Sequence, residues 1–271
     1  MEELIIKKGD LFKKYYELDR GEEGIVFDYD NHYALKVFDK EKYNMSTEEN
    51  RNRYKNKLQK VEAMFKLKDP SFCFPLEFLS FSSNNPVGYY MDKVLYNSDI
   101  KRDYTFSYLR RLANSCYNEE LLNLLIEGSD AIERIHKKDI ILADIKEKNI
   151  MIDKNWRVKF VDTDNYRYQD FDFDLHPFKA ECLKNRYGRD MSMKDNDIFL
   201  YAVLVFDILL EGDFPNYIDD DNIFDLYINK LSIPKEAKEK LLCIFSDADN
   251  KPYVGSVLRD IPSDEKVLIK R

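Results

Sequence analysis

Four polar residues in the middle of the chain have the types and the spacing that phosphoryl transfer requires. Asp144, Lys146 and Asn149 lie within one short run, and Asp162 follows two strand-like segments further on. Such chemistry needs a carboxylate near the acceptor hydroxyl, a cation for the transferring phosphoryl group, and oxygen ligands for Mg²⁺. Asp144 and Asn149 have the D-x-x-x-x-N spacing of a catalytic loop. We therefore predict that Asp144 and Lys146 are catalytic and that Asn149 and Asp162 bind Mg²⁺.

The surrounding run, IHKKDIILADIKEKNIMID, resembles the catalytic loop of eukaryotic-type Ser/Thr protein kinases. The residues in register with that family's pattern are His136, Ile140, Asp144, Lys146 and Asn149. A lysine two residues after the aspartate is typical of the Ser/Thr-type members. The resemblance implies a Ser/Thr protein kinase-like phosphotransferase that uses ATP and Mg²⁺ and acts on a protein substrate. The richness in Lys, Asn and Ile suggests an AT-rich genome, so a divergent bacterial or phage member is expected.

Two segments before this loop resemble the nucleotide-binding parts of the same family. Gly21-Glu22-Glu23-Gly24-Ile25-Val26 is similar to the latter part of the glycine-rich loop, and Tyr33–Phe38 is similar to the V-A-I-K strand. The resemblance implies that Gly21 and Gly24 form the loop and that Lys36 holds the α/β-phosphates, while Val26 and Ala34 pack on adenine. An acidic Glu22-Glu23 tip beside phosphates would be repulsive unless it points outward.

The resemblance also implies a carboxylate partner for Lys36 on the helix that follows. Glu62 is the expected partner because it lies among apolar residues at helical spacing, with Glu48 and Glu49 as alternatives. Val87–Asp92 resembles the strand that enters the inter-lobe hinge, so Met91 and Asp92 are expected beside the nucleotide. Asp197 opens an apolar helix, where the resemblance implies that it braces the backbone of the catalytic loop.

Two of the departures from the family pattern lie in and after the predicted catalytic loop. Leu142-Ala143 stands where the family has His-Arg, and Asp162-Thr163-Asp164 stands where it has D-F-G. Without the arginine, regulation through a phosphate clamp on the activation loop is not expected. Asp164 is interpreted as a solvated carboxylate, with a second metal ligand as the alternative.

Two other functions stay open. The altered glycine loop and Asp162-Thr163-Asp164 support a nucleotide-binding pseudokinase acting as an interaction module. The spacing of Asp144 and Asn149 also resembles that of small-molecule kinases of the aminoglycoside type, which usually lack a lysine at the position of Lys146.

Strand and helix signals are unevenly distributed along the chain. The first ninety residues contain strand patterns and one long helical pattern, and the rest is mostly helical. The expected strands are 24–30, 33–38, 74–81, 87–91, 150–152 and 158–161, and the expected helices are 46–68 with Ser46 as its N-cap, 119–136, 198–210 and one beginning near Pro234. We predict an α+β fold of the bilobal protein-kinase-like type. One domain would span residues 1–271, with a β-rich N-lobe at about 1–92 and a larger α-helical C-lobe at about 95–271.

The composition limits where the protein acts and what it binds. With 271 residues, 44% hydrophobic and 35% charged, it is expected to be a soluble globular protein. The formal net charge of -8 argues against a nucleic-acid partner. The 4 cysteines are scattered without a CxxC pair, which favours reduced thiols in the cytoplasm over a zinc site. The apolar run at 199–210 is too short to span a bilayer, so no membrane association is expected.

Overall fold

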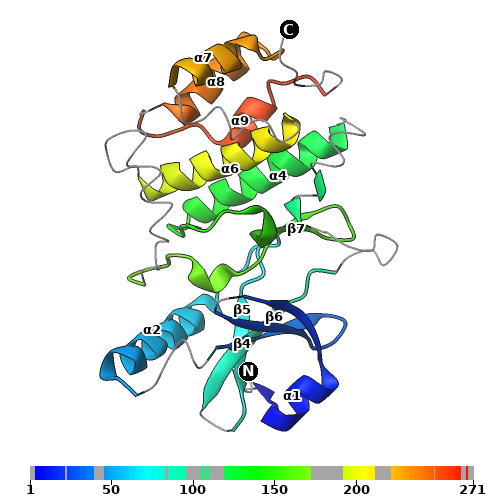
Figure 1. Cartoon of the computed structure of the whole chain (residues 1–271), viewed down its shortest axis with the longest axis vertical. Coiled ribbons are helices and arrows are strands. Elements are labelled where there is room, and N and C mark those ends of the chain that lie inside the picture. The colour runs from blue at the N-terminus through cyan, green and yellow to red at the C-terminus, as the bar shows by residue number, and fades with distance from the viewer. Residues whose placement is uncertain are drawn as a thin grey trace. The chain divides into compact units, whose positions relative to one another are not determined.

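The computed structural model divides the chain into two compact units (Figure 1). Residues Met1–Leu95 and Phe160–Asp164 form the first, called here the sheet unit, and Tyr96–Lys159 and Asn165–Arg271 form the second, the helical unit. The structure describes residues 4–21, 23–39, 46–82, 85–95, 105–106, 108–109, 119–171, 192–210, 221–246, 248–263 and 267. Strands dominate the early part and helices the later part, which confirms the predicted mixture of α and β structure.

The sheet unit is built on a six-stranded sheet with the strand order β1-β5-β6-β4-β3-β2. Its strands are β1 (Leu4–Ile5), β2 (Tyr16–Arg20), β3 (Gly24–Asp28), β4 (Tyr33–Phe38), β5 (Pro75–Ser80) and β6 (Pro86–Asp92). β1 and β5 are parallel, and the other neighbours are antiparallel. The hairpin of β3 and β4 confirms the prediction from the turn residues between them. β4 lies inside the sheet, with paired strands on both sides.

The alternation of side chains along the central strands divides the sheet into two faces. On one face Phe27, Leu35 and Val87 form a buried cluster with Leu11 of helix α1 (Lys8–Lys14). The cross-strand pairs identify the residues of the other face. Lys36 lies opposite Val26 of β3 and Tyr89 of β6, and Ala34 lies opposite Met91. Residues two apart on a strand share a face, so these five side chains lie on the same side of the sheet.

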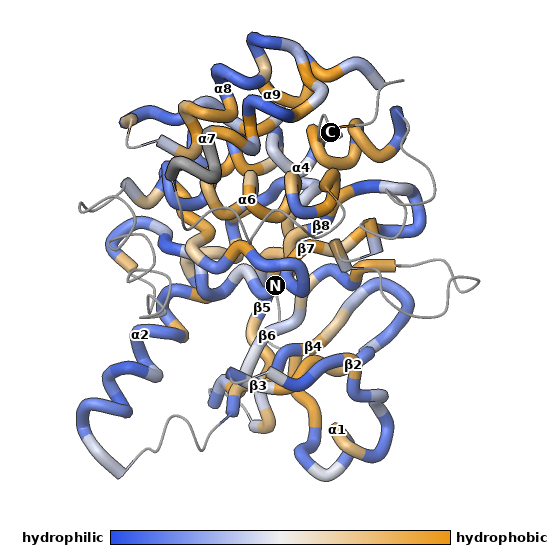
Figure 2. The backbone as a smooth tube through the Cα atoms, turned by 45° about the horizontal axis from the view of Figure 1, so that its top comes forward, coloured by the Kyte–Doolittle hydropathy of each residue, from blue (hydrophilic) through white to orange (hydrophobic). Residues whose placement is uncertain are grey.

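Helix α2 (Glu48–Met64) is the long helix of the sheet unit and corresponds to the expected helix at 46–68. Its N-cap is Thr47, whose side chain accepts a hydrogen bond from the backbone N–H of Asn50, so the predicted cap at Ser46 is wrong by one residue. Both residues are good caps, and only the backbone geometry decides between them. Figure 2 shows that α2 is hydrophilic along most of its length, in contrast to the apolar helix α6.

The helical unit contains α4 (Glu119–His136), α6 (Met193–Leu209), α7 (Asp221–Lys230), α8 (Lys235–Phe245) and α9 (Val254–Leu258). α4 has the predicted bounds, and it packs on both α6 and α9. α6 begins before the predicted Ile198 because Ser192 caps it, accepting a 3.1 Å hydrogen bond from the Asp195 N–H. β7 (Ile150–Ile152) and β8 (Val158–Phe160) form a two-stranded sheet. Phe160, the last residue of β8, is the point where the chain enters the sheet unit.

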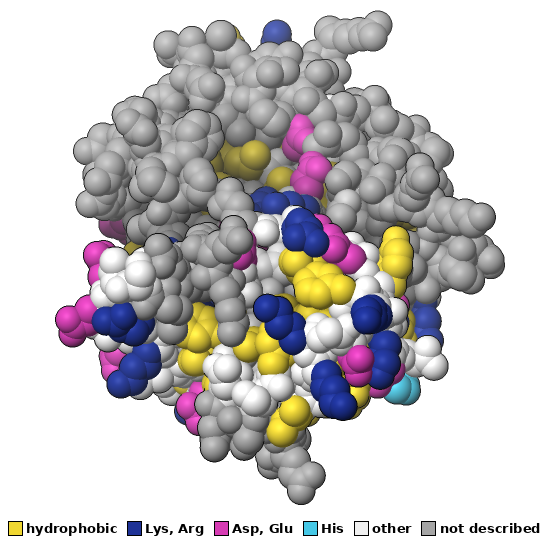
Figure 3. All heavy atoms as spheres, turned by 60° about the horizontal axis from the view of Figure 1, so that its bottom comes forward, with side chains coloured by type: hydrophobic (Ala, Val, Ile, Leu, Met, Phe, Trp, Pro, Cys, Tyr) yellow, Lys and Arg dark blue, Asp and Glu magenta, His cyan; other side chains and the backbone are white. Residues whose placement is uncertain are grey.

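The surface carries charges of both signs. Figure 3 shows one face on which lysine and arginine side chains alternate with acidic ones and with exposed hydrophobic side chains. Phe12 and Tyr16, near the N-terminus, are among the exposed large hydrophobic residues. In the part of the chain that the structure describes, no helix combines the length and the apolar character that crossing a membrane requires.

Candidate functional site

Lys36 is the centre of an ionic network in the sheet unit. It lies on the central strand β4 and is only 4% exposed. Its ammonium group contacts Asp162, donates a 2.7 Å hydrogen bond to Asp164 Oδ1, and lies 3.8 Å from Glu23 Oε2. Burial alone would lower the pKa of Lys36, but the charges of Asp162 and Asp164 outweigh it and hold that pKa well above its usual value. Lys36 is therefore a fixed positive charge inside the sheet unit.

Asp164 is the second buried member of this network and shares its carboxylate between two lysines. Its Oδ1 accepts hydrogen bonds from Lys36 and, at 2.8 Å, from the Tyr89 hydroxyl, and its Oδ2 lies 2.7 Å from Lys57 Nζ of α2. Burial would raise the pKa of Asp164, but Lys36 and Lys57 hold it well below its usual range. The interpretation of Asp164 as a solvated carboxylate is wrong, because its side chain is 0% exposed. The two lysines compensate the desolvation that an isolated buried carboxylate would suffer.

Asp162 is held at the entry of the chain into the sheet unit. Backbone hydrogen bonds from Phe160 N–H to Ser71 O at 2.7 Å and from Cys73 N–H to Phe160 O at 2.9 Å attach the end of β8. The Thr163 hydroxyl adds a 3.0 Å hydrogen bond to Cys73 O. Asp162 itself has a φ of 59°, a left-handed conformation that aspartate tolerates better than most residues. Its carboxylate is about one-third exposed, unlike that of Asp164.

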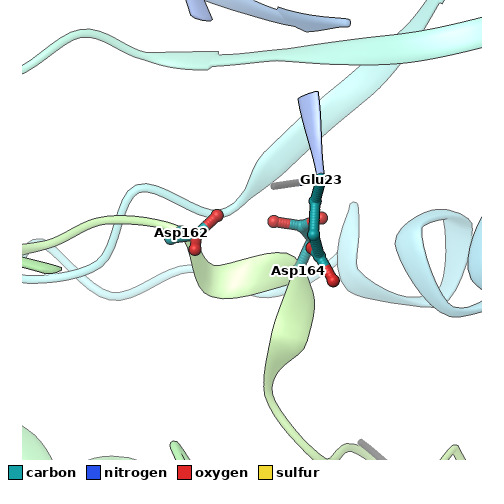
Figure 4. A group of neighbouring side chains, drawn as sticks. All are labelled: Glu23, Asp162 and Asp164. Carbon is teal, nitrogen blue, oxygen red and sulfur yellow. The ribbon is translucent and has the colours of Figure 1, made fainter. Parts of the chain in front are cut away.

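Glu23 brings a third carboxylate into this site from the turn before β3. Figure 4 shows its carboxylate beside that of Asp164, while Asp162 comes from the same short segment as Asp164. One oxygen atom of each of these carboxylates lies within 4.8 Å of the others. Glu23 Oε2 is also 3.2 Å from Lys57 Nζ. Glu23 therefore does not point outward, because two lysines attract it inward; Glu22 lies outside the described residues.

The turn at Gly21 and Gly24 is closed by a 3.0 Å hydrogen bond from Gly21 N–H to Gly24 O. A Cβ atom on Gly24 would lie 2.2 Å from Val37 O, so glycine is required there by the closeness of β4. Gly21 is exposed and has open space around it. The first of these two glycines is thus tolerant of substitution, while the second fixes the pairing of β3 with β4.

The other expected nucleotide-binding residues separate into two groups. The pairing register puts Val26, Ala34 and Met91 on the same face of the sheet as Lys36. Asp92 lies opposite Tyr33, is exposed, and therefore belongs to the other face by alternation. The sheet thus places an apolar surface of three side chains next to the buried lysine.

The expected pairing of Lys36 with Glu62 is not found in this structure. Glu62 lies on α2 but is exposed, and so are the alternatives Glu48 and Glu49 in the first turn of that helix. Among the described residues, Lys36 has its carboxylate partners in Glu23, Asp162 and Asp164. The physical reason is that three carboxylates already surround Lys36. A further glutamate would be repelled by them, and α2 instead directs Lys57 towards them.

The helical unit holds the second set of candidate residues in the loop between α4 and β7. Asn149 Nδ2 donates hydrogen bonds to Asp144 Oδ2 at 2.9 Å and to Asp144 O at 3.0 Å, and Lys146 contacts the same carboxylate. A short 3-10 helix, Glu147–Asn149, turns the chain so that these three side chains meet. The structure therefore brings together the three residues of the predicted catalytic loop, whose roles stay a prediction.

Asp197 fixes the backbone of this loop from α6. Its Oδ2 accepts a 2.7 Å hydrogen bond from Leu142 N–H, and its Oδ1 accepts one of 2.9 Å from Ala143 N–H. His136 Nε2 forms a 3.0 Å hydrogen bond with Asp197 Oδ2. Ala143 has a φ of 60°, which costs an alanine roughly 1–2 kcal/mol and persists because both amides are held. The bracing role expected for Asp197 is confirmed by these hydrogen bonds.

Mg²⁺ prefers carboxylate and amide oxygen ligands, and the candidate residues differ in how freely they offer such atoms. Asn149 uses its side-chain N–H group inside the loop, and within the described part of the chain its amide oxygen accepts no hydrogen bond. Asp162 has a partly exposed carboxylate. Asp164 fits less well, because each of its carboxylate oxygens lies against a lysine. Asn149 and Asp162 thus fit a metal-binding role, and Asp164 fits that of a counter-ion.

Comparison with known proteins gives a limited relationship. No protein-family model matches the chain. A probable serine/threonine-protein kinase of Dictyostelium discoideum, kinX, is 23% identical over 192 residues, which is 65% of this chain. The match covers 17% of the kinX sequence, so this chain corresponds to a small part of that protein. The similarity indicates a distant, kinase-like relationship.

Proposed function

We propose that this chain is an ATP- and Mg²⁺-dependent phosphotransferase with a bilobal kinase-like fold. The observation that carries the proposal is the meeting of Lys36 with Asp162, which are 126 residues apart in the sequence. A buried lysine on a sheet beside a partly exposed carboxylate is what phosphate and metal binding need. The distant similarity to a probable kinase supports the same conclusion.

The sheet unit would bind the nucleotide. Val26, Ala34 and Met91 offer an apolar surface for a base on the face that carries Lys36. Lys36 would hold the phosphates as a compact, permanently charged donor. Bound Mg²⁺ would neutralise the charge that develops on the phosphates, with Asp162 and Asn149 as its protein ligands.

The helical unit would supply the groups that act on the acceptor. Asp144 would accept the proton of the acceptor hydroxyl as its oxygen bonds to the γ-phosphorus and the bond to ADP breaks. Lys146 would stabilise the transferring phosphoryl group, and Asn149 orients Asp144 through their hydrogen bonds. The strained, braced backbone at Ala143 keeps this loop in one conformation.

The acceptor class is proposed from two observations. Lys146 stands two residues after Asp144, as in the Ser/Thr-type kinases that the loop resembles, and the similar Dictyostelium protein bears the name of a probable serine/threonine-protein kinase. A serine or threonine hydroxyl of a protein is therefore the proposed acceptor. Ala143 offers no guanidinium for a phosphate clamp, so we expect phosphatase treatment to leave the rate unchanged; a fall in rate would contradict this.

A nucleotide-binding pseudokinase is the second candidate, because one observation favours it. Glu23 is turned towards Lys36 and Lys57 and adds negative charge where phosphates would bind. Such an arrangement opposes the placement of the phosphates for transfer unless Glu23 moves or a metal ion compensates it, while the apolar face of Val26, Ala34 and Met91 stays available for a base.

The test is phosphate transfer from [γ-³²P]ATP with Mg²⁺ to the protein itself and to dephosphorylated casein. Wild type is compared with Lys36→Met, Asp162→Ala and Asp144→Asn, with the exposed Lys148→Ala as the control near the loop. We expect Asp144→Asn to lower the rate by about 10²–10⁴-fold. If wild type transfers no phosphate but its melting temperature rises with ATP, and if Lys36→Met abolishes that rise, the pseudokinase is favoured. Equal rates in all proteins would contradict the proposal.

A further inference from the structure

Lys57 occupies an unusual place on α2. Together with Tyr54, Val61 and Met64 it follows the spacing of a single helix face, and those three neighbours are buried. The Lys57 side chain is only 10% exposed. A cation in the middle of an apolar stripe is costly unless it is paired, so a specific partner must hold it there.

Asp164 and Glu23 are carboxylate partners of Lys57. Asp164 is the nearer and is contacted twice, and Glu23 Oε2 accepts a further 3.2 Å hydrogen bond from Lys57 Nζ. Lys57 Nζ lies 2.7 Å from Asp164 Oδ2 and donates a 3.2 Å hydrogen bond to the backbone carbonyl of the same residue. The ammonium group also lies 5.9 Å from the centre of the Phe38 ring, within the range of a cation–π contact. A side chain with these contacts has little freedom to reorient.

Asp164 transmits this contact to Lys36. One carboxylate oxygen faces Lys57 and the other accepts the hydrogen bonds of Lys36 and Tyr89. A continuous chain of charged contacts therefore runs from α2 to the central strand β4. In this series of contacts, α2 contributes the cation, Lys57, and the segment after β8 contributes the anion, Asp164.

We propose that Lys57 is a positioning residue for the proposed phosphotransferase, acting on Lys36 through Asp164. This inference rests on the proposed function and adds a residue to it. Glu62 has no part in it, because it is exposed. Any shift of α2 moves Asp164 and changes where the Lys36 ammonium points, so the activity depends on the placement of α2 through a lysine.

The first test measures activity in folded protein. ATP turnover on casein is compared for Lys57→Met, Lys57→Arg, Asp164→Asn and the double variant Lys57→Met/Asp164→Asn, at a temperature where circular dichroism shows each to be folded. Lys55→Met is the matched control, an exposed lysine on the same helix. We expect Lys57→Met to lower kcat/KM on the order of 10–100-fold, as loss of a supporting contact does. Lys57→Arg should restore part of the rate, and the double variant should lose no more than the worse single variant.

Several results would overturn the proposal. One is a kcat/KM of Lys57→Met equal to that of Lys55→Met. Another is a loss of kcat/KM in the double variant equal to the product of the two single losses. A third is a larger loss of kcat/KM in Glu62→Gln than in Lys57→Met. A merely structural role would lower the melting temperature of Lys57→Met while leaving kcat/KM of the folded protein unchanged.

A second measurement needs no nucleotide, so it separates failure of this inference from failure of the proposed function. Lysine acetylation by an N-hydroxysuccinimide acetate is followed at each site by mass spectrometry. We expect labelling of Lys36 to rise in Lys57→Met relative to Lys55→Met, while the buried Lys251 of the helical unit stays protected as the reference. If wild type shows no ATP turnover, the proposed function fails, and unchanged Lys36 labelling would then show that Lys57 does not position it either.

Discussion

Asp164 joins two lysines that are distant from it in the sequence. Lys36 is 128 residues away and Lys57 is 107 residues away. Patterns of residue type along a chain carry no information about such a meeting, so the sequence could not predict that this carboxylate is buried. The meeting of Asp144, Lys146 and Asn149 was easier to predict because they lie on one loop with a fixed spacing.

The pH dependence of stability follows from these charges. The pKa of Asp164 lies below its unfolded value of 3.8, so its contribution is complete above that value and is lost as the pH falls towards the folded pKa. Burial and the charge of Asp164 raise the pKa of Tyr89 well above 10.0, so its contribution is lost only as the pH rises beyond that. We expect urea unfolding free energies of wild type to fall more steeply below about pH 4 than those of Asp164→Asn. The exposed Asp19→Asn is the control, and identical slopes for all three proteins would contradict the expectation.

Glu23 gives a prediction for nucleotide affinity. It lies 3.8 Å from Lys36 and 3.2 Å from Lys57, so its carboxylate competes with phosphate for both ammonium groups. Because it is about one-fifth exposed, solvent weakens this effect, and Glu23→Gln should tighten ATP binding by ~1 kcal/mol or less. Calorimetric titration with a non-hydrolysable ATP analogue and Mg²⁺ measures the change, again with Asp19→Asn as the control. Weaker binding by Glu23→Gln would show that Glu23 helps to hold the metal or the nucleotide.

At the scale of elements, two close approaches of backbone determine how the central strands pair. A Cβ atom on Gly88 would lie 1.9 Å from Lys36 O, and one on Gly24 would meet Val37 O. Both glycines therefore let a neighbouring strand approach β4 where it carries Lys36. The absence of a side chain at Gly24 and Gly88 therefore sets the distance of β3 and β6 from β4 and, with it, the position of Lys36.

Substitution of Gly88 tests this cause. Gly88→Ala must push β6 away from β4, so we expect it to lower the free energy of unfolding by about 1–3 kcal/mol, as overpacking does. Gly9→Ala is the matched control, because Gly9 lies in α1 with no atom within 4 Å of its added Cβ. That change should instead stabilise the protein by about 0.5–1 kcal/mol. Urea unfolding measures both, and equal effects of the two substitutions would contradict the argument.

Helix and strand positions were largely predictable because periodicity is a local property. α4 has the predicted bounds, and α8 begins next to the expected Pro234. The errors concern choices that neighbours in space decide, such as Thr47 in place of Ser46 as the cap of α2. The face of α2 that turns inward is the most important of them. A lysine such as Lys57 is expected from sequence to be solvated, and the buried carboxylate of Asp164 opposite it reverses that expectation.

At the scale of the whole molecule, the chain enters the sheet unit twice. Phe160–Asp164 belongs to it although residues on both sides belong to the helical unit. This short segment supplies Asp162 and Asp164, and Glu23 is the carboxylate partner of Lys36 from the N-terminal part of the unit. The sheet unit is therefore incomplete as a contiguous piece of chain.

A fragment of residues 1–95 should show this incompleteness. It would retain the buried Lys36 and Lys57 without Asp164, and breaking a buried ion pair by removing one partner costs about 3–5 kcal/mol. We expect residues 1–95 alone to lack a cooperative urea transition, and residues 158–165 joined by a Gly-Ser linker to restore it. The same fusion with Asp164→Asn is the control and should restore less. A fragment as stable alone as with the added segment would refute the expectation.

The second entry of the chain into the sheet unit also determines the order in which parts of this unit can form during translation. A ribosome that has finished residue 95 must add roughly seventy more before Asp164 exists, which takes about 3–14 s at about 5–20 residues per second. The apolar cluster around Phe27, Leu35 and Leu79 needs only the earlier residues and can form during that interval. Of the carboxylates in this network, Lys36 and Lys57 have Glu23 in the nascent chain, and Asp162 and Asp164 follow later. In the nascent chain, apolar contacts would therefore precede both the ionic site and the cooperative folding of the sheet unit, and the proposed catalyst could not act before most of its length had been translated.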